Sequence, residues 1–123
     1  MTASTSPMHT PPYARVLASL TRLPNVSGAI VVDLEQGLVV DSNVQFGVDA
    51  DAVAALSATL YRKARSSSRT AGLGEVSLLR LEAELGQLYM VGAGELLLVA
   101  IADARASIGQ LRAEVQRAAR SLA

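Results

Sequence analysis

Residues 26–41 read Val-Ser-Gly-Ala-Ile-Val-Val-Asp-Leu-Glu-Gln-Gly-Leu-Val-Val-Asp, and this stretch decides the expected fold. Two β-branched apolar runs, residues 30–32 and 38–40, flank a polar turn at residues 33–37. Gly37 can adopt the positive φ that a short hairpin loop often requires. The first run is apolar at consecutive positions, which is typical of a strand covered on both faces. The stretch therefore predicts a β-hairpin whose first strand needs covering elements on two sides.

Three amphipathic helices are predicted to supply that cover, because apolar residues recur at spacings of three and four in three segments. The first helix is expected over residues 12–23. The second is expected over about residues 49–65, where its initial aspartate is a favourable N-cap. The third begins at Asp103 or Ser107 and ends near Leu122; the serine has a glutamine three residues on, the spacing of a capping box.

Three further strands are predicted between the second and third helices. They cover residues 76–81, 87–91 and 96–101, and the short connections between them favour an antiparallel meander. The last of these runs is continuously apolar, so it is expected to be central. The first contains Arg80 and is followed by two glutamates, which is typical of an edge strand.

The composition is that of one domain with an aliphatic core. The chain has 123 residues, 50% of them hydrophobic but only 3% aromatic, with a formal net charge of zero and no cysteine. No apolar run approaches the roughly 20 residues of a membrane helix, and no secretory signal is visible. We expect a cytoplasmic protein without membrane insertion, with a disordered tail at residues 1–11 and a domain over residues 12–123.

The sequence offers little for catalysis. His9, the only histidine, falls in the expected tail, and no cysteine is present, so a nucleophilic triad is not expected. Asp33, Glu35 and Asp41 are open to two interpretations, an acid/base or Mg²⁺ cluster and ordinary turn solvation, and we favour the second. Neither Gly-x-Gly segment has the third glycine or the Gly-Lys-Ser/Thr of a phosphate loop. We expect no catalytic residue, cofactor, metal or nucleic acid.

The middle helix is unusual in composition. Val53, Leu56, Leu60 and Ala64 mark one apolar face. Where a surface helix normally carries Glu and Lys, small side chains and one tyrosine stand instead: Ala50, Ala52, Ala54, Ala55, Ala58 and Tyr61. These residues indicate either a second contact surface or simply the high helix propensity of alanine. Four cations at residues 62–69 indicate either favourable charges at the helix C-terminus or a site for an acidic partner.

Several segments together resemble the roadblock (dynein light-chain) domain family. Residues 20–33, Leu-Thr-Arg-Leu-Pro-Asn-Val-Ser-Gly-Ala-Ile-Val-Val-Asp, are similar to the family's opening helix and its step into a hydrophobic strand. Residues 37–40, 96–99 and 108–112 are similar to its second strand, last strand and final helix. The order of elements also agrees, and the resemblance covers about residues 12–122. Asn25 is a departure, because members often have glycine there.

The resemblance implies an α+β fold with a five-stranded antiparallel sheet in the order 2-1-5-4-3. The first and last helices would lie on one face of this sheet and the middle helix on the other. Members typically form dimers in which the middle helices pair antiparallel and the third strands pair across the axis. The implied dimer contacts in this chain are Ala50, Ala54, Ala55, Ala58, Tyr61, Arg62, Val76, Leu78 and Arg80.

The resemblance also implies a function without chemistry of its own. Family members bind and regulate Ras-like small GTPases, in one bacterial case by accelerating GTP hydrolysis, or serve as subunits of motor and membrane-anchoring complexes. The primary hypothesis is therefore a homodimeric, non-catalytic module that regulates a Ras-like small GTPase. The alternative is a structural adaptor with the same fold and no GTPase partner, and a third, minor hypothesis is an enzyme or small-ligand sensor.

Overall fold

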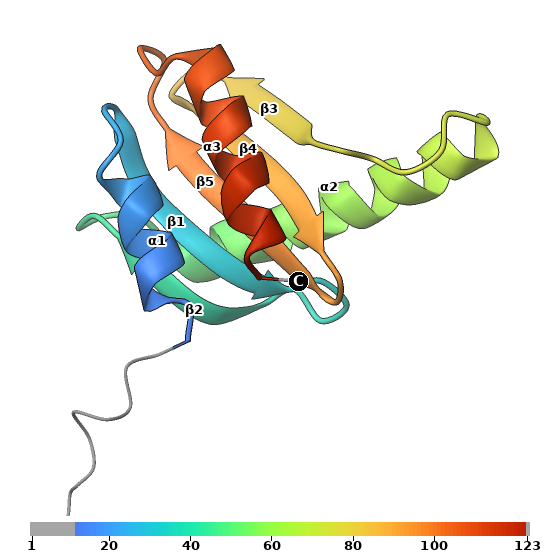
Figure 1. Cartoon of the computed structure of the whole chain (residues 1–123), viewed down its shortest axis with the longest axis horizontal. Helices are drawn as coiled ribbons and strands as arrows, with labels where there is room; N and C mark the ends of the chain where they lie inside the picture. The colour runs from blue at the N-terminus through green and yellow to red at the C-terminus, as the bar shows by residue number, and fades with distance from the viewer. Residues whose placement is uncertain (1–11, 123) are drawn as a thin grey trace, which may run out of the picture.

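A computed structural model describes residues 12–122 of the chain (Figure 1). The predicted tail and His9 lie outside these described residues. The described part contains eight elements in the order helix, two strands, helix, three strands, helix. They are α1 (Ala14–Thr21), β1 (Val26–Asp33), β2 (Leu38–Val44), α2 (Ala50–Thr70), β3 (Leu79–Ala83), β4 (Gly86–Ala93), β5 (Leu96–Ala102) and α3 (Ile108–Arg120).

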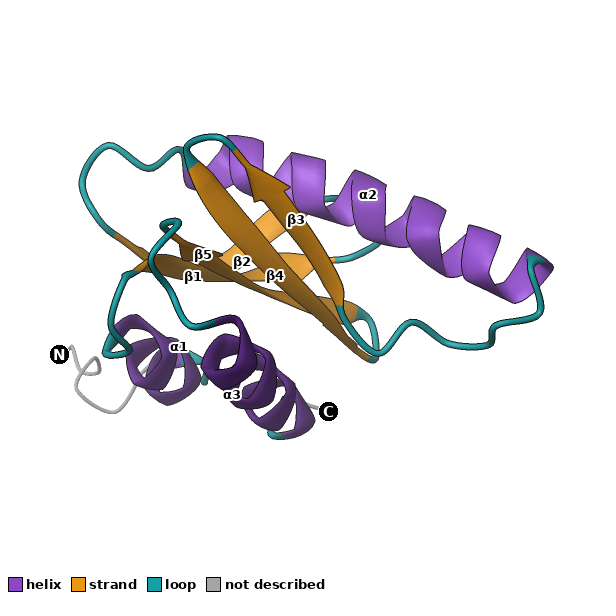
Figure 2. Ribbon diagram, turned by 90° about the horizontal axis from the view of Figure 1, so that it is seen from above, coloured by secondary structure: helices purple, strands orange, loops and turns teal. Residues whose placement is uncertain are grey.

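The five strands form one sheet in the order β2-β1-β5-β4-β3, and every neighbouring pair is antiparallel. The expected order is confirmed, with β1 and β5 inside and β3 at an edge. Helices α1 and α3 lie side by side on one face of the sheet, and α2 crosses the other face (Figure 2). The fold therefore has three layers, with the sheet in the middle.

The run of apolar residues in β1 supplies both layers of the core. Ala29, Ile30, Val31 and Val32 are all completely buried. Because successive strand residues point to opposite faces, Ile30 and Val32 pack beneath α2 while Ala29 and Val31 pack beneath α1 and α3. Burial on both sides explains why the run does not alternate with polar residues.

Around the connection between α2 and β3, two element boundaries differ from the sequence prediction. Helix α2 continues to Thr70 instead of ending near residue 65, because neither Gly nor Pro interrupts the segment before Gly72. The chain then returns through two positive-φ glycines, Gly72 and Gly74, before β3 begins at Leu79. Residues expected at the start of that strand, including Val76 and Leu78, therefore belong to the connection.

The turn between α1 and β1 accommodates the departure at Asn25. This asparagine has φ +67°, in the left-handed region that favours glycine. Asparagine tolerates this region better than most residues. The backbone carbonyl of Asn25 also accepts a hydrogen bond from the Asp103 amide at 2.9 Å. The turn therefore has the left-handed backbone conformation that glycine favours, although residue 25 is asparagine.

Candidate protein interface

Helix α2 lies close to the sheet because its inward side chains are small. Ala54, Ser57 and Ala58 are completely buried beneath it. The approach is close at the β1–β2 turn as well, where a Cβ added to Gly37 would lie 3.5 Å from the Ala58 methyl group and 3.6 Å from the Ala55 Cα. Those distances are ordinary van der Waals contacts, so it is the φ of Gly37, +71°, that makes glycine the favoured residue in this turn.

This packing corrects the prediction for the faces of the middle helix. Ala54, Ala58 and Tyr61, which we expected to contact a second copy, lie in the core of the single chain and are 0%, 0% and 4% exposed. Leu56, which we placed on the apolar face, is 46% exposed. Helical spacing identifies which residues share a face, but it does not say which face meets the sheet. The close approach at Gly37 allows only the small-residue face to fit there.

Tyr61 connects α2 to strand β4 and to the segment before β3. Its hydroxyl donates to the Val76 carbonyl at 3.1 Å and accepts from the Gly92 amide at 3.2 Å. A Cβ at Gly92 would lie only 2.7 Å from that hydroxyl oxygen. Glycine near the end of β4 is therefore required by this contact, and the tyrosine joins α2, β4 and the connection before β3.

Leu60 of α2 faces sideways, toward β3. Together with its helix neighbours and β3 it lines an open groove of about 280 Å³. Its lining residues are Leu60, Lys63, Ala64, Ser67, Leu79, Arg80 and Leu81. Leu60 and Ala64 are not among the contacts expected from the sequence, whereas Leu79 and Leu81 lie in the segment 76–81, whose edge the resemblance places at the dimer axis. Their spacing indicates a shared face in each case, because Leu60 and Ala64 are four residues apart on a helix and Leu79 and Leu81 are two residues apart on a strand.

The groove continues onto the free edge of β3. This strand pairs only with β4, so its other edge has no strand beside it among the described residues. Such an edge presents backbone N–H and C=O groups that can pair with another strand. An apolar groove next to an open strand edge is a surface that another protein chain can extend and cover.

Two arginines of the predicted interface already have partners within the chain. Arg62 donates to the Leu34 carbonyl at 2.6 Å, which holds the β1–β2 turn against α2. Arg80 donates to the side chain of Gln87 at 3.0 Å and to the Tyr89 hydroxyl at 3.3 Å. The hydrogen bond to Tyr89 is the main cause of a raised Arg80 pKa. Both arginines thus have structural roles in the monomer.

The remaining predicted contacts are distributed unevenly. Ala55 is exposed on α2 and Ala50 is half-buried at the start of the helix. Val76 packs against the core under α2, whereas Leu78 packs against the core under α1 and α3. The structure therefore does not bring all nine predicted residues to one surface.

The basic end of α2 is partly neutralised. Arg69 forms a two-pronged pair with Glu75, with both nitrogen–oxygen distances 3.0 Å. The hydrogen bond from Arg69 is the main cause of a lowered Glu75 pKa. Lys63 and Arg65 form no hydrogen bond or ion pair with the residues that the structure describes. These two cations are the ones available to an acidic partner.

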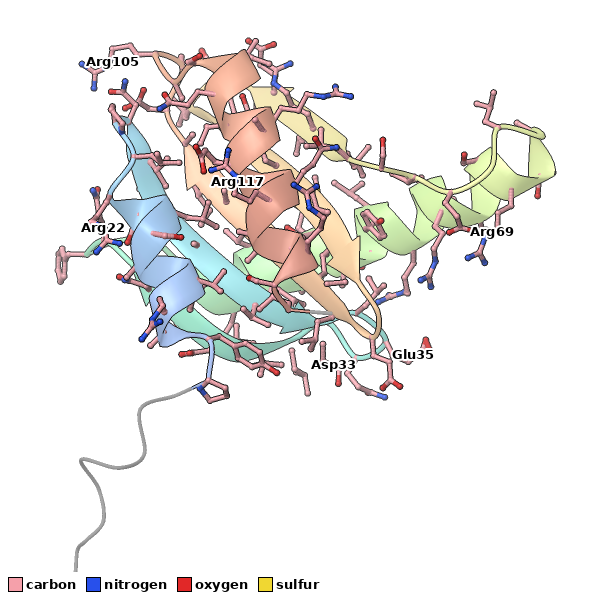
Figure 3. All side chains as sticks on the ribbon, viewed as in Figure 1. Arg22, Asp33, Glu35, Arg69, Arg105 and Arg117 are labelled. Atoms are coloured by element: carbon pink, nitrogen blue, oxygen red, sulfur yellow. The ribbon has the colours of Figure 1, made fainter. Side chains whose placement is uncertain are left out.

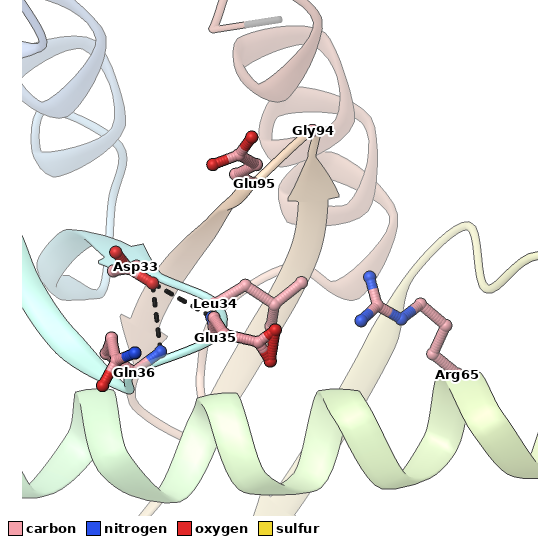
Figure 4. A pocket seen from close by; sticks show the side chains of 7 residues that line it. All are labelled: Asp33, Leu34, Glu35, Gln36, Arg65, Gly94 and Glu95. Atoms are coloured by element: carbon pink, nitrogen blue, oxygen red, sulfur yellow. Dashed lines mark hydrogen bonds between the residues drawn. The ribbon is translucent and has the colours of Figure 1, made fainter.

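The carboxylates at the β1–β2 turn serve the turn itself. Asp33 accepts hydrogen bonds from the amides of Glu35 and Gln36, both at 3.0 Å, in a hollow of about 270 Å³ (Figure 4). Side chains from this turn, from the β4–β5 turn and from α2, including Arg65, surround the hollow. Asp41 lies within β2, outside the turn, and its carboxylate accepts from the Ser42 amide at 2.9 Å. No metal-binding cluster of His, Cys, Asp or Glu occurs within residues 12–122.

Within the described part of the chain, no helix is both long and apolar enough to cross a membrane.

Comparisons with known proteins agree with this architecture. The Roadblock/LC7 domain family matches residues 13–102. Two sequence relatives are uncharacterized proteins of Methanocaldococcus jannaschii. One is 37% identical over 105 residues, covering 85% of this chain and 88% of that protein. The other is 33% identical over 108 residues, covering 88% of this chain and 94% of that protein.

Solved structures show the same fold. A Roadblock/LC7 domain from Streptomyces avermitilis has a TM-score of 0.78 and 25% identity, covering 88% of this chain and 92% of its own. MglB of Myxococcus xanthus has a TM-score of 0.77 and 26% identity, covering 91% and 94%. A structure described as MglB with tetrameric arrangement has a TM-score of 0.78 and 26% identity, covering 92% and 88%. The chain belongs to the Roadblock/LC7 domain family.

Proposed function

We propose that this protein is a non-catalytic homodimeric interaction module that binds and regulates a Ras-like small GTPase. The observation that carries the dimer is the apolar groove between α2 and β3 beside an open strand edge. A second copy related by a two-fold axis would place its own β3 along this edge and its own α2 across the groove. Each copy would then cover the apolar residues of the other.

The dimer contacts proposed here differ in part from those expected from the sequence. Leu60, Ala64, Leu79 and Leu81 form the apolar centre, with exposed Leu56 beside them. Of the residues predicted earlier, Ala50, Ala55 and Val76 remain candidates at the border. A specific dimer of this kind usually buries about 1,200–2,000 Å² in total.

The GTPase partner is supported by family membership. The roadblock family that the sequence resembles includes regulators of Ras-like GTPases, and structures of MglB are among the similar ones. A regulator that reshapes the active site of its partner needs a folded surface but no catalytic group of its own. Lys63 lines the proposed dimer groove, and Arg65 lines a separate hollow at the acidic β1–β2 turn; both offer polar contacts to such a partner.

The dimer is tested with Leu60→Glu, which places a charge in the middle of the groove. Light scattering is expected to give twice the 12.8 kDa chain mass for the parent and a monomer for this variant. Leu38→Glu is the matched control, because Leu38 is 63% exposed on β2 at the opposite edge of the sheet. A parent that remains monomeric, or a Leu60→Glu variant that remains dimeric, would show that the groove is not the interface.

The GTPase partner is tested by affinity capture from native lysate with and without a non-hydrolysable GTP analogue. Capture of a small GTPase that depends on the analogue supports the regulator, and the captured protein then enters a GTP hydrolysis assay with and without this chain. Capture of other proteins regardless of nucleotide favours the alternative, a structural adaptor. The hydrolysis assay separates stimulation from simple tethering.

A further inference from the structure

The outer surface of α1 and α3 carries a concentrated positive charge. Residues 12–23 and 108–122 contain five arginines and one acidic residue, Glu114, a net charge of +4 in a chain whose formal net charge is zero. All five arginines are exposed, and they are Arg15, Arg22, Arg112, Arg117 and Arg120. The remainder of the chain is correspondingly acidic.

The fold brings these arginines together from the two ends of the domain. Helices α1 and α3 pack side by side, and Arg22 and Arg117 project from the same face of the molecule (Figure 3). Glu114 pairs with Arg117 at 2.6 Å. The other four arginines form no ion pair with any residue between 12 and 122. Clustered like charges without partners oppose folding, so they indicate a surface kept for binding.

A groove of about 330 Å³ runs between the two helices beneath these charges. Half-buried Val16 and Ala118 give it an apolar lining, and exposed Arg15 and Arg117 stand at its rim. Two serines also line it, and their hydroxyls donate to carbonyls of their own helices at 2.7 Å. The serines are therefore small and already satisfied. Glu114 also lines the groove and is paired with Arg117, which leaves Arg15 as the arginine of the groove without an ion pair among the described residues.

The chemistry of this groove identifies its occupant. Guanidinium groups bind carboxylates in a planar, two-pronged geometry, and the apolar lining accepts an aliphatic side chain. An anionic membrane fits less well, because Ile108 is the only large apolar residue of α1 or α3 that is strongly exposed, and stable membrane attachment needs a second signal besides charge. We infer that the α1–α3 groove binds a segment of another protein that combines carboxylates with one aliphatic anchor.

This surface lies on the side of the sheet opposite the α2–β3 groove (Figure 2). A dimer formed through α2 and β3 would leave both α1–α3 grooves exposed. The inference therefore goes beyond the proposed function and does not depend on either the dimer or the GTPase.

The test uses a library of random peptides of about 16 residues, long enough to span the roughly 10 Å between Glu114 and Ser121 along α3. The library is selected on the full-length protein. Enriched peptides are expected to contain several Asp or Glu residues around an aliphatic residue. Their affinity, measured by fluorescence anisotropy, should fall when salt is raised from about 50 to 300 mM.

Two charge-reversal variants locate the site. Arg15→Glu, at the rim of the groove and free of intrachain ion pairs, is expected to weaken peptide binding about tenfold or more. Arg112→Glu is the matched control, because it makes the same charge change on an exposed position of α3 that does not line the groove, and it should weaken binding much less. Thermal unfolding followed by circular dichroism confirms that both variants are folded.

Four results would overturn the inference. They are no enrichment, enrichment of non-acidic peptides, equal binding by Arg15→Glu and the parent, and equal losses in the two variants. Flotation with vesicles of phosphatidylcholine containing about a quarter phosphatidylglycerol covers the membrane alternative. Vesicle binding that requires Arg15, without peptide binding, would assign this face to a lipid surface instead.

Discussion

The two faces of the sheet are covered in different ways. On one face, α1 and α3 pack side by side and contribute large buried residues such as Leu17, Leu20 and Leu111. On the other, α2 is alone and contributes three small buried residues, Ala54, Ser57 and Ala58, and one large one, Tyr61. Five strands spaced about 4.8 Å apart span about 19 Å, whereas one helix with its side chains is about 10–12 Å across. A single helix therefore cannot cover the second face, and the part beside β3 stays open.

This difference distinguishes a face that the chain closes by itself from one that stays partly open. The α1–α3 face has a continuous core, and only its outer surface is available for binding. The α2 face leaves part of its own core layer accessible in the groove between Leu60 and Leu81. Covering apolar surface of this kind with a second chain removes it from water, which is favourable. The α1–α3 face of the sheet is thus filled by residues of the chain itself, whereas the α2 face leaves apolar surface that a second chain can cover.

The largest expected effect concerns the buried face of α2. Ala58→Glu places a charge where the side chain is completely buried, and an unpaired buried charge costs about 3–5 kcal/mol before any steric cost. We expect a chain that does not fold, as judged by circular dichroism. Ala55→Glu, on the exposed side of the same helix, should fold normally. A folded Ala58→Glu variant would contradict the assignment of this face.

The two core layers can be compared within one strand. Leu97 faces the α2 layer and Leu98 the α1–α3 layer, and both are completely buried. Each change to Ala is expected to cost about 2–5 kcal/mol in urea unfolding. Leu98→Ala should cost more than Leu97→Ala. Leu97 lies in the layer that borders the open groove, and that layer can close around a cavity more easily. Leu85→Ala, at a residue 93% exposed, should have almost no effect. A larger loss of unfolding free energy for Leu97→Ala than for Leu98→Ala would contradict this expectation.

A smaller effect of opposite sign is expected at Ser57. Its hydroxyl is buried beneath α2 without a hydrogen-bond partner. Ser57→Ala removes this unsatisfied group and improves helix propensity, so it should raise the free energy of unfolding by about 1 kcal/mol. Ser66→Ala, at an exposed position of α2, should show the propensity contribution alone. Equal effects of the two substitutions would mean that the Ser57 hydroxyl is satisfied in solution.

The smallest effect concerns pH. A side-chain hydrogen bond from Arg105, at 3.1 Å, is the main cause of a lowered Asp103 pKa. Because the pKa is lower in the folded state, this carboxylate stabilises the protein above its unfolded pKa of about 4 and loses that contribution as the pH falls through the folded value. Asp103→Asn should therefore be slightly less stable than the parent at pH 7, and the difference should disappear at low pH. A difference that is constant with pH would exclude the ion pair as its cause.

Much of the fold could be predicted from the sequence because its signals are local. The consecutive apolar runs at residues 30–32 and 96–101 indicated central strands, and Arg80 with the two following glutamates indicated an edge, which the sheet order confirms. Caps at Asp49 and Ser107 were also predictable, and both side chains accept the expected backbone hydrogen bond. The end of α2 was less predictable, because serines and arginines neither continue nor stop a helix decisively.

The candidate site could be predicted only in part. The alanines of α2 and the third strand indicated the part of the molecule in which the groove lies, but Ala54 and Ala58 are buried within the single chain and Leu56 is exposed. Ala58 and Leu56 are both acceptable on a buried or a contact surface, so pattern alone could not decide between them. The interface proposed here depends on the side of α2 that β3 leaves uncovered, which is a property of the assembled sheet.

The sequence by itself determined the order of elements, the two central strands, the caps and the family, because these follow from the periodicity of apolar residues and from short-range backbone preferences. Only the tertiary structure decided which face of α2 is buried, because that depends on the distance between the helix and the β1–β2 turn at Gly37. It also decided that arginines about 90 residues apart share one surface, because the pairing of β1 with β5 brings α1 beside α3. Charge totals and local patterns contain no information about such distances.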